Sequence, residues 1–540
     1  MPQLTLFTIT VLLTTAAHAY IWPSPQLDAL ESLRFDTDRH QLAPFVQPCT
    51  FFIFEVAGKS GRSNAADWIR TAYHDMATHN NVDGTGGMDA SIRFPEEQAR
   101  AENVADGFNN TLRIVGPAAN RYVSLADVLA LAAITAIENC GGPSIPFRGG
   151  RIDAAAPNAP GVPQPQEDLA THTATFKRQG FSKTEMIGLV ACGHTFGGVA
   201  HAPFPDIVPD LNDTSNTQSV AHFDGTPVAF DNSVASQYIA NTTRNPLVVG
   251  TNATTNSDAR IFGSDGGKVM RGFASSPALF ASTCASLFAR MLDTVPSGVV
   301  LSEVLSPLPA KPDALQLTLD GDKLLFAGEV RFWNTPDSSS RTVLLLGTDH
   351  SNHTFNATLV SAGTASSSSA GAGQTITNAW YSFDDPGVVL DAAAGVTRIS
   401  FSVYENGEDA KKKTKGKVFD QGGRGFAVQD AVVFSKTSCL TKPNAQPVEG
   451  RLDVGVRTGA KVTRVFLEEE VKDSVGRITV VETDFPRPAP AAGNSTSKAY
   501  TIWSLPTTQS SAKHTVGAEI DGVKVSTGRV VVLTNLPACA

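Results

Sequence analysis

The sequence lacks an excess of positive charge, a paired-cysteine motif and, after its first residues, any long apolar run. It carries 43 Lys and Arg residues against 52 Asp and Glu, a formal net charge of −9, and the basic residues form no stripe. We therefore expect no nucleic-acid partner. The absence of any C-x-x-C spacing argues against a zinc or thioredoxin-like site. No later segment reaches the roughly 18–20 apolar residues that a membrane span needs, so we expect no span.

The overall composition is that of a globular protein. Hydrophobic residues make up 41% and charged residues 18% of the 540-residue chain. The chain is too long for one ordinary core, and about 100–200 residues per domain predicts two to four domains.

Residues 1–19 have the pattern of a secretory signal peptide. An apolar run from Leu4 to Leu13 precedes small residues that end at Ala19, although the segment before the run lacks Lys and Arg. Seven N-x-S/T sequons follow, at Asn109, Asn212, Asn241, Asn252, Asn352, Asn356 and Asn494. Together these features predict a secreted, extracellular glycoprotein.

The six cysteines predict disulfide bonds, because a secreted chain folds in an oxidising compartment. They are Cys49, Cys140, Cys192, Cys284, Cys439 and Cys539. Four lie in the first half of the chain and two in the second, which favours pairing within halves. The sequence does not select among the connectivities, and Cys439 with Cys539 is the best single pair.

The first half of the chain is predicted to be helical. Apolar residues recur at three- and four-residue spacings in five segments, 65–77, 125–138, 166–179, 183–192 and 277–292. Before them, residues 23–48 form a proline-bearing lead-in without clear periodicity. We interpret residues 20–298 as one helical domain.

The second half is predicted to be all-β. Beyond the proline-rich stretch at residues 306–309, short alternating or β-branched runs dominate, which is typical of one or two antiparallel sandwiches. We assign residues 299–436 to a β-rich domain and residues 437–540 to a second one or to a continuation of the first. The Gly- and Ser-rich stretch at 363–373 is predicted to be a loop or hairpin tip.

Residues 68–75 place a cation and a titratable ring on one helical face. Arg70 and His74 are four residues apart, so in a helix both can reach one small ligand. The plainer alternative is a solvated surface. A second stretch, residues 186–197, ends an apolar helix on His194 between glycines, where a large planar group could approach the backbone. Its alternative is a core histidine bonded to a carbonyl.

Six motifs in order resemble the secreted haem peroxidases of the plant, fungal and bacterial superfamily, and the fungal secreted members look most similar. The motifs are RxxYHD at residues 70–75, GMDAS at 87–91, GGRID at 149–153, GHTFG at 193–197, FDGTPVAFDN at 223–232 and Ser257-Asp258. The resemblance covers residues 50–295 and none of the β-rich half.

The resemblance implies haem b, held on its proximal face by His194. In that family pattern Asp258 would accept a hydrogen bond from His194 Nδ1 and give the imidazole imidazolate character. Phe223 would pack beside the ring, where some relatives carry an oxidisable Trp.

On the distal face the resemblance implies that His74 is the general base and Arg70 stabilises developing negative charge. Asn103 would accept from His74 Nδ1 and fix its tautomer. An ordinary helix or turn asparagine is the alternative for Asn103. Tyr73 departs from the pattern, which has Phe or Trp there. It is either a packed aromatic residue whose hydroxyl finds a local acceptor, or a redox-active phenol beside the haem.

The resemblance also implies two calcium sites made of hard oxygen ligands. The distal ligands would be Asp75, the Gly87 carbonyl, Asp89 and Ser91. The proximal ligands would be Thr195, Asp224, Thr226, the Ala229 carbonyl and Asp231. Gly197 stands where manganese-oxidising relatives carry a carboxylate, so no manganese site is expected.

These features predict a secreted, monomeric haem peroxidase that uses hydrogen peroxide to oxidise small phenolic or aromatic donors by one-electron steps. The alternative is a degenerate, haem-retaining scaffold whose β-rich half binds carbohydrate or a cell surface. Carbohydrate or cell-wall contact through the β-rich half is also compatible with the first interpretation.

Overall fold

The computed structural model describes residues 20–36, 42–55, 59–367, 375–384, 387–405, 416–442, 448–488, 497–509, 514–527 and 536–539. The predicted signal peptide at 1–19 and the sequon at Asn494 lie outside these ranges. Among the described helices, none alone is long and apolar enough to cross a membrane, while α11 and α12, bent by 118°, pass that test only as a pair.

Helices dominate the first half, as predicted. The α-helices are α1 Pro25–Phe35, α2 Asn64–Met76, α3 Pro95–Gln98, α4 Gly107–Val115, α5 Leu125–Asn139, α6 Leu169–Arg178, α7 Lys183–Gly193, α8 Ser233–Ile239, α9 Pro246–Val249, α10 Ser257–Gly263, α11 Lys268–Ser275 and α12 Pro277–Leu292. The 3-10 helices are η1 Ala43–Val46, η2 Ser91–Arg93, η3 Ala101–Asn103, η4 Gly116–Ala118 and η5 Ala253–Thr255.

Strands dominate the second half. They are β3 Ala310–Asp320, β4 Lys323–Phe332, β5 Thr342–Thr348, β6 Thr354–Thr358, β7 Val360–Ser367, β8 Ile376–Ser382, β9 Val388–Asp391, β10 Arg398–Tyr404, β11 Lys417–Phe419, β12 Phe426–Ala427, β13 Val432–Ser435, β14 Cys439–Lys442, β15 Val448–Arg457, β16 Val462–Lys472, β17 Ile478–Asp484, β18 Tyr500–Gln509, β19 His514–Ile520 and β20 Val523–Ser526. Two short strands, β1 Gly198–Ala200 and β2 Val220–His222, pair within the helical half. A mainly helical domain followed by an all-β region is therefore confirmed.

The five predicted helices form, and side-chain caps define where several of them begin. Ser63 accepts the Ala66 N–H at the start of α2, and Ser124 does the same for Asp127 at the start of α5. Ser182 and Glu185 form a reciprocal capping box at the start of α7. These caps fix the first turns of the helices that carry the candidate site.

The lead-in at residues 23–48, for which the sequence predicts no element, contains two helices. Residues 25–35 form α1, and η1 follows. The helix escaped detection because its inward face is partly charged: Glu31 and Arg34 are buried together with Leu30 and Leu33. An apolar periodicity cannot reveal a helix that buries ion pairs.

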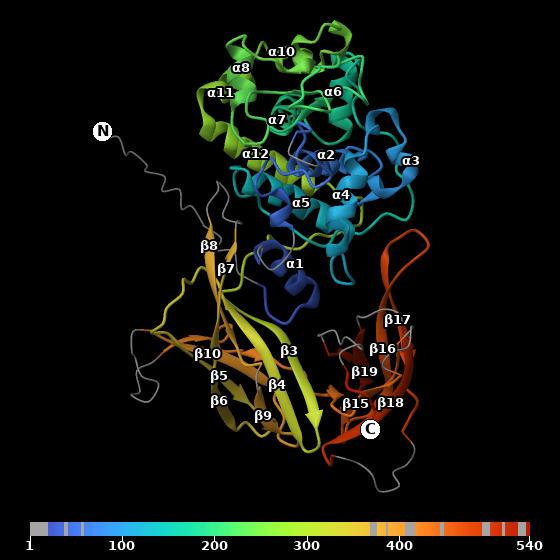
Figure 1. Cartoon of the computed structure of the whole chain (residues 1–540), viewed down its shortest axis with the longest axis vertical. Coiled ribbons are helices and arrows are strands. Elements are labelled where there is room, and N and C mark those ends of the chain that lie inside the picture. Colours follow the sequence, from blue (N-terminus) through green and yellow to red (C-terminus); the bar gives the residue numbers. More distant parts are fainter. Residues whose placement is uncertain are drawn as a thin grey trace, which may run out of the picture.

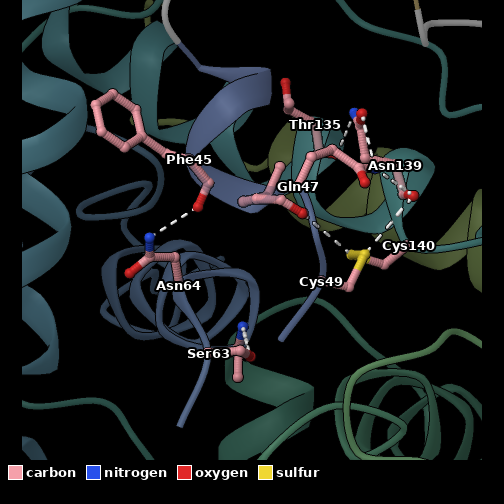
Figure 2. The surroundings of a disulfide bond; sticks show 10 residues. Phe45, Gln47, Cys49, Ser63, Asn64, Thr135, Asn139 and Cys140 are labelled. Atoms are coloured by element: carbon pink, nitrogen blue, oxygen red, sulfur yellow. Dashed lines mark hydrogen bonds between the residues drawn. A yellow bond between two sulfur atoms is a disulfide. The ribbon is translucent and has the colours of Figure 1, made fainter. Parts of the chain in front are cut away.

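All three disulfides join residues of the same half, as predicted, and Cys439–Cys539 is confirmed. Cys49–Cys140 ties the segment before α2 to the end of α5, and Cys192–Cys284 ties α7 to α12. Figure 2 shows Asn64 at the start of α2 donating to the Phe45 carbonyl at 2.7 Å beside the first of these bonds. The α2–α5 pair is thereby anchored at one end.

In the described part of the β-rich half, a nine-stranded sheet packs face to face against two smaller sheets, and each of these two contacts encloses a hydrophobic core. Among the described residues, one sheet of nine strands includes β3, β4 and β8 at one end and β13, β15 and β18 at the other. Its first part packs on the sheet of β5, β6, β10, β11 and β12, and its second part on the sheet of β16, β17, β19 and β20. Because β13 pairs with both β3 and β15, the predicted division at residue 436 falls inside one continuous sheet. The stretch at 363–373 is predicted to be a loop or hairpin tip, but residues 363–367 belong to strand β7. Residues 368–373 lie outside the described ranges.

Buried ion pairs join the two halves through α1, which lies between the helices and the strands in Figure 1. Glu31 contacts Lys311 of β3 at 2.7 Å and Arg331 of β4 at 2.5 Å. Burial opposes ionisation of Glu31, but the two cations outweigh it and hold its pKa below the usual value. On the other side, Arg121 pairs with Glu468 of β16 at 2.8 Å.

Candidate active site

A cavity of about 600 Å³ lies between α2 on one wall and α7, α10 and the β1–β2 segment on the other. Arg70, Tyr73 and His74 line the α2 wall, and His194 and Phe223 line the opposite wall. Gly197 lets the two walls approach each other: its φ is +74°, and a Cβ there would lie 2.9 Å from Ala66 Cβ of α2. The residues that the sequence singled out thus face one space.

His74 is held by a fixed amide. His74 Nδ1 lies 2.6 Å from Asn103 Oδ1, and Asn103 Nδ2 donates to the Glu97 carbonyl at 2.7 Å. Since the Asn103 amide nitrogen is committed to that carbonyl, its oxygen faces His74, and Nδ1 must carry the proton. His74 Nε2 is then the basic atom. Asn103, at the end of η3, thus presents its amide oxygen to His74 Nδ1.

Burial and a neighbouring cation keep the His74 ring neutral. Burial first, and the Arg70 charge second, hold the pKa of His74 well below 6.5. The Arg70 guanidinium donates to the Glu102 carbonyl at 3.1 Å and lies 4.4 Å from the centre of the Phe108 ring. Burial lowers the pKa of Arg70 to about 10, so it stays charged at neutral pH.

Tyr73 is a packed aromatic residue in the cavity wall. Its ring stacks on Phe176 with centroids 6.2 Å apart and meets His74 edge-on at 5.9 Å. The hydroxyl is shielded from solvent and makes no hydrogen bond with the described residues. Burial raises the pKa of the phenol, against smaller effects of Gln179 and Arg178. The packing matches the first alternative, and Gln179 is the polar side chain that acts on the hydroxyl.

On the opposite wall, His194 lies at the end of α7 and is oriented by the carboxylate of Asp258 in α10. His194 Nδ1 lies 2.8 Å from Asp258 Oδ2, and Asp258 is 1% exposed. The Phe223 ring stacks on the imidazole at 3.9 Å with an interplanar angle of 11°. Nδ1 is thereby committed, which leaves Nε2 of a cavity-lining ring available as a ligand.

Asn245 is a site residue that the sequence did not reveal. Its Nδ2 donates to Asp258 Oδ2 at 2.7 Å, the same atom that accepts from His194. Its Oδ1 accepts the Leu247 N–H at the start of α9. The only signal in the sequence is an Asn-Pro helix start, which gives no hint of a contact with Asp258.

The GGRID motif at residues 149–153 is structural. Arg151 is buried and bonds Asp127 of α5 at 2.8 Å and the Leu292 carbonyl of α12 at 2.6 Å. Asp153 accepts the N–H groups of Leu125 and Ala126 at the start of α5. The motif therefore joins two core helices and has no direct part in the cavity.

The site residues fit a haem. Each wall carries an imidazole whose Nδ1 is engaged by an acceptor, so both Nε2 atoms are free toward a cavity large enough for a planar group. His194 would hold the iron, as the chemistry of imidazole ligands allows. His74 and Arg70 would face the other side of the group.

The predicted proximal calcium ligands lie together. Thr195 Oγ1 contacts the carbonyls of Ala229 at 3.4 Å and Asp231 at 2.8 Å. Asp224 Oδ1 accepts from the Thr226 N–H at 2.9 Å, while its Oδ2 is buried and makes no hydrogen bond with the described residues. Burial, together with the charge of Asp231, raises the pKa of Asp224 to about 6. A buried carboxylate oxygen without a partner fits a bound cation.

The predicted distal calcium ligands also lie together, but their oxygens are engaged. Asp75 accepts the N–H groups of Asp89, Ala90 and Ile92, and Asp89 Oδ1 accepts the Ser91 N–H. Gly87 adjoins them through its N–H, which donates to Thr78 Oγ1 at 3.1 Å. No group of three or more His, Cys, Asp or Glu side chains in the described part of the chain is arranged to hold a metal, so any site here depends on carbonyl and hydroxyl oxygens.

Comparison with protein families supports the resemblance. Residues 53–276 match the family model described as "Peroxidase". Over 321 residues the chain is 40% identical to a "WSC domain-containing protein" of Arthroderma benhamiae, an alignment that covers 58% of this chain and 43% of that protein.

Named peroxidases match shorter stretches. The chain is 35% identical over 140 residues to "L-ascorbate peroxidase 5, peroxisomal" of Arabidopsis thaliana, covering 26% of this chain and 49% of that protein. It is 32% identical over 136 residues to "Cytochrome c peroxidase, mitochondrial" of Yarrowia lipolytica, covering 24% and 39%. The chain spans less than half the length of each of these relatives. Residues 53–276 of the helical half therefore form a domain of the peroxidase superfamily.

Proposed function

We propose that this chain is a secreted haem peroxidase that uses hydrogen peroxide to oxidise small phenolic or aromatic donors by one-electron steps. The observation that carries the proposal is the pairing of His74 with Asn103, beside Arg70, across one cavity from His194 with Asp258. The alternative of a degenerate scaffold is not favoured, because each of these contacts is intact.

Each residue has a defined task. A bound haem would supply the iron and the electrons for reducing peroxide. His194 would hold the iron through Nε2, and Asp258 would keep that imidazole electron-rich by accepting from Nδ1. His74 Nε2 takes a proton from the entering peroxide and returns it to the departing oxygen, a role worth about 10²–10⁴-fold in rate. Arg70 stabilises the negative charge that develops as the O–O bond breaks.

Aromatic donors suit the remainder of the cavity. Apolar side chains line it beyond the two histidines, among them Val199, Pro203, Phe204 and Ile207. Such a lining favours contact with small rings over charged donors.

Secretion, glycosylation and calcium belong to the same proposal. All six sequon asparagines in the described ranges are exposed, and three disulfides close within the two halves. Both features suit an oxidising, glycosylating compartment. Calcium at the proximal ligands would brace the segment that follows His194.

Stopped-flow spectroscopy after peroxide addition tests the proposal. Purified holoprotein should show a Soret band that changes with peroxide and recovers with a phenolic donor. His74→Ala should keep the haem and lose about 10²–10⁴-fold in the rate of the peroxide step. His353→Ala, at a side chain 83% exposed in the β-rich half, is the matched control and should react normally. A haem-loaded protein that oxidises no standard donor would refute the proposal and favour the degenerate scaffold.

A further inference from the structure

The two predicted calcium sites differ in which groups already contact their carboxylate oxygens. At the proximal site, Asp224 is 6% exposed, its Oδ2 has no hydrogen bond with the described residues, and Asp231 adds a second negative charge. An external cation would give Asp224 Oδ2 the partner that it lacks.

At the distal site, a side-chain amide lies among the oxygens that would bind the ion. Asn158 Nδ2 lies 3.1 and 2.9 Å from the two carboxylate oxygens of Asp89, 3.0 Å from Ser91 Oγ and 3.3 Å from Thr78 Oγ1. One nitrogen with two hydrogens is thus surrounded by four oxygens from three residues. Asp89 and Ser91 are two of the ligands that the family pattern assigns to the distal calcium, so the amide lies where that cation would bind.

The chain holds Asn158 in this position from both sides of its peptide. The Asn158 N–H donates to Glu97 Oε1 at 2.5 Å, and the Arg100 guanidinium donates to the Asn158 carbonyl. The side chain is therefore directed into the cluster by backbone contacts and does not depend on an ion for its placement.

Positive charge is also present at the distal site. Arg100 lies 3.6 Å from Glu97 Oε2, and burial raises the pKa of Asp89 against smaller effects of the Asn158 amide, the Ser91 donors and, last, the Arg93 charge. The remaining acid, Asp75, is bonded by three backbone N–H groups. Backbone N–H groups thus bond Asp75, and the Asn158 amide contacts Asp89 and Ser91, so donors already engage the side-chain oxygens that calcium would require.

We infer that the Asn158 amide takes the place of the distal cation, so that this chain binds one calcium ion, at the proximal site, and none at Asp75, Asp89 and Ser91. The inference rests on the proposed proximal calcium but not on peroxide turnover. The same contacts connect Asn158 to the residue that orients His74. Glu97 accepts the Asn158 N–H through its side chain and Asn103 Nδ2 through its carbonyl.

Metal analysis of the full-length holoprotein tests the inference. After extensive dialysis against calcium-free buffer, plasma mass spectrometry should give one calcium per chain in the wild type. Asp224→Asn should remove that ion, whereas Asp89→Asn, the matched distal change, should retain it. Asn158→Asp replaces the amide by a carboxylate of the same shape and should raise the count to two in calcium-containing buffer.

Three outcomes would overturn the inference: two ions in the wild type, a single ion lost in Asp89→Asn, or no calcium at all. The last would also remove the proximal assignment. Haem content and donor oxidation, measured on the same samples, report separately on the proposed function. If Asp224→Asn does not fold, the wild-type count and the Asp89→Asn count still decide the matter.

Discussion

At the scale of single residues, His74 combines a buried, neutral ring with an adjacent fixed cation. Burial and Arg70 together hold its pKa well below 6.5. A base with that property stays unprotonated, and so able to accept the peroxide proton, in mildly acidic solution.

We predict that the rate of the peroxide step stays constant as pH falls from about 7 through about 6.5, the unperturbed value for histidine, and declines only in more acidic solution. Arg70→Leu removes the repelling cation and should move this decline to higher pH, besides slowing the step. Stopped-flow rates between about pH 4 and pH 8 measure both curves. A wild-type midpoint near 6.5 would contradict the prediction.

The lowered pKa of His74 also determines how the stability of the folded protein changes with pH. The unfolded chain binds the His74 proton near its ordinary pKa, whereas the folded chain resists it. The contribution of His74 to folding is therefore fully present above about pH 6.5 and is lost as pH falls toward the folded pKa.

Asp258 receives two hydrogen bonds on one oxygen, and the two donors should act oppositely on the haem iron. Asp258→Asn removes the charge that makes His194 electron-rich, so the Fe(III)/Fe(II) potential should rise. Asn245→Ala removes the competing donor, makes Asp258 a stronger acceptor and should lower the potential. Spectroelectrochemical titration measures both. Shifts of the same sign would show that Asn245 does not act through Asp258.

At the scale of elements, the buried face of α1 forms ion pairs with strands of the β-rich half. Lys311 and Arg331 come from β3 and β4, yet their partners Glu31 and Asp36 come from α1 and the residue that ends it. Neither half could bury these groups alone without leaving charges unpaired.

Arg331→Met should therefore destabilise the protein by about 3–5 kcal/mol, the usual cost of removing one partner of a buried ion pair. Burial already raises the pKa of Asp36, and losing Arg331 leaves that carboxylate without its cation. Lys436→Met, which breaks the exposed pair with Asp320, is the control and should change stability by about 0–1 kcal/mol. Urea unfolding monitored by circular dichroism gives both values.

At the scale of the whole molecule, the peroxidase half depends on the β-rich half for its N-terminal helix. Figure 1 shows α1 between the two halves and the β16–β17 hairpin extending toward α3 and α4. At that hairpin, the Arg93 guanidinium contacts the Val475 carbonyl at 3.3 Å. The halves are therefore joined at both sides of the helical domain.

We predict that ending the chain after residue 298 yields a helical domain that unfolds at lower denaturant than the full chain, because Glu31 loses Lys311 and Arg331 together. Glu31→Gln in the shortened chain removes the unpaired charge and should restore part of the stability. In the full chain the same substitution should destabilise. Comparing the four unfolding midpoints checks this reversal of sign, and a shortened chain as stable as the full one would contradict it.

The sequence by itself determined the elements and residues whose signal is local. Helices such as α5 follow from apolar spacing and a serine cap, and Arg70 with His74 follows from a four-residue separation. The ordered motifs placed His194 opposite them and Asp258 beside it. Each of these signals is contained in a few neighbouring residues or in a recurring pattern.

Only the tertiary structure decided which groups complete the site and how the halves join. Asn158 reaches Asp89 across 69 residues, and Glu31 reaches Arg331 across 300. Asn245 shares Asp258 with His194, and β13 unites two β layers in one sheet. A buried polar group must find its partner wherever the fold brings one, and that partner leaves no periodic trace in the sequence.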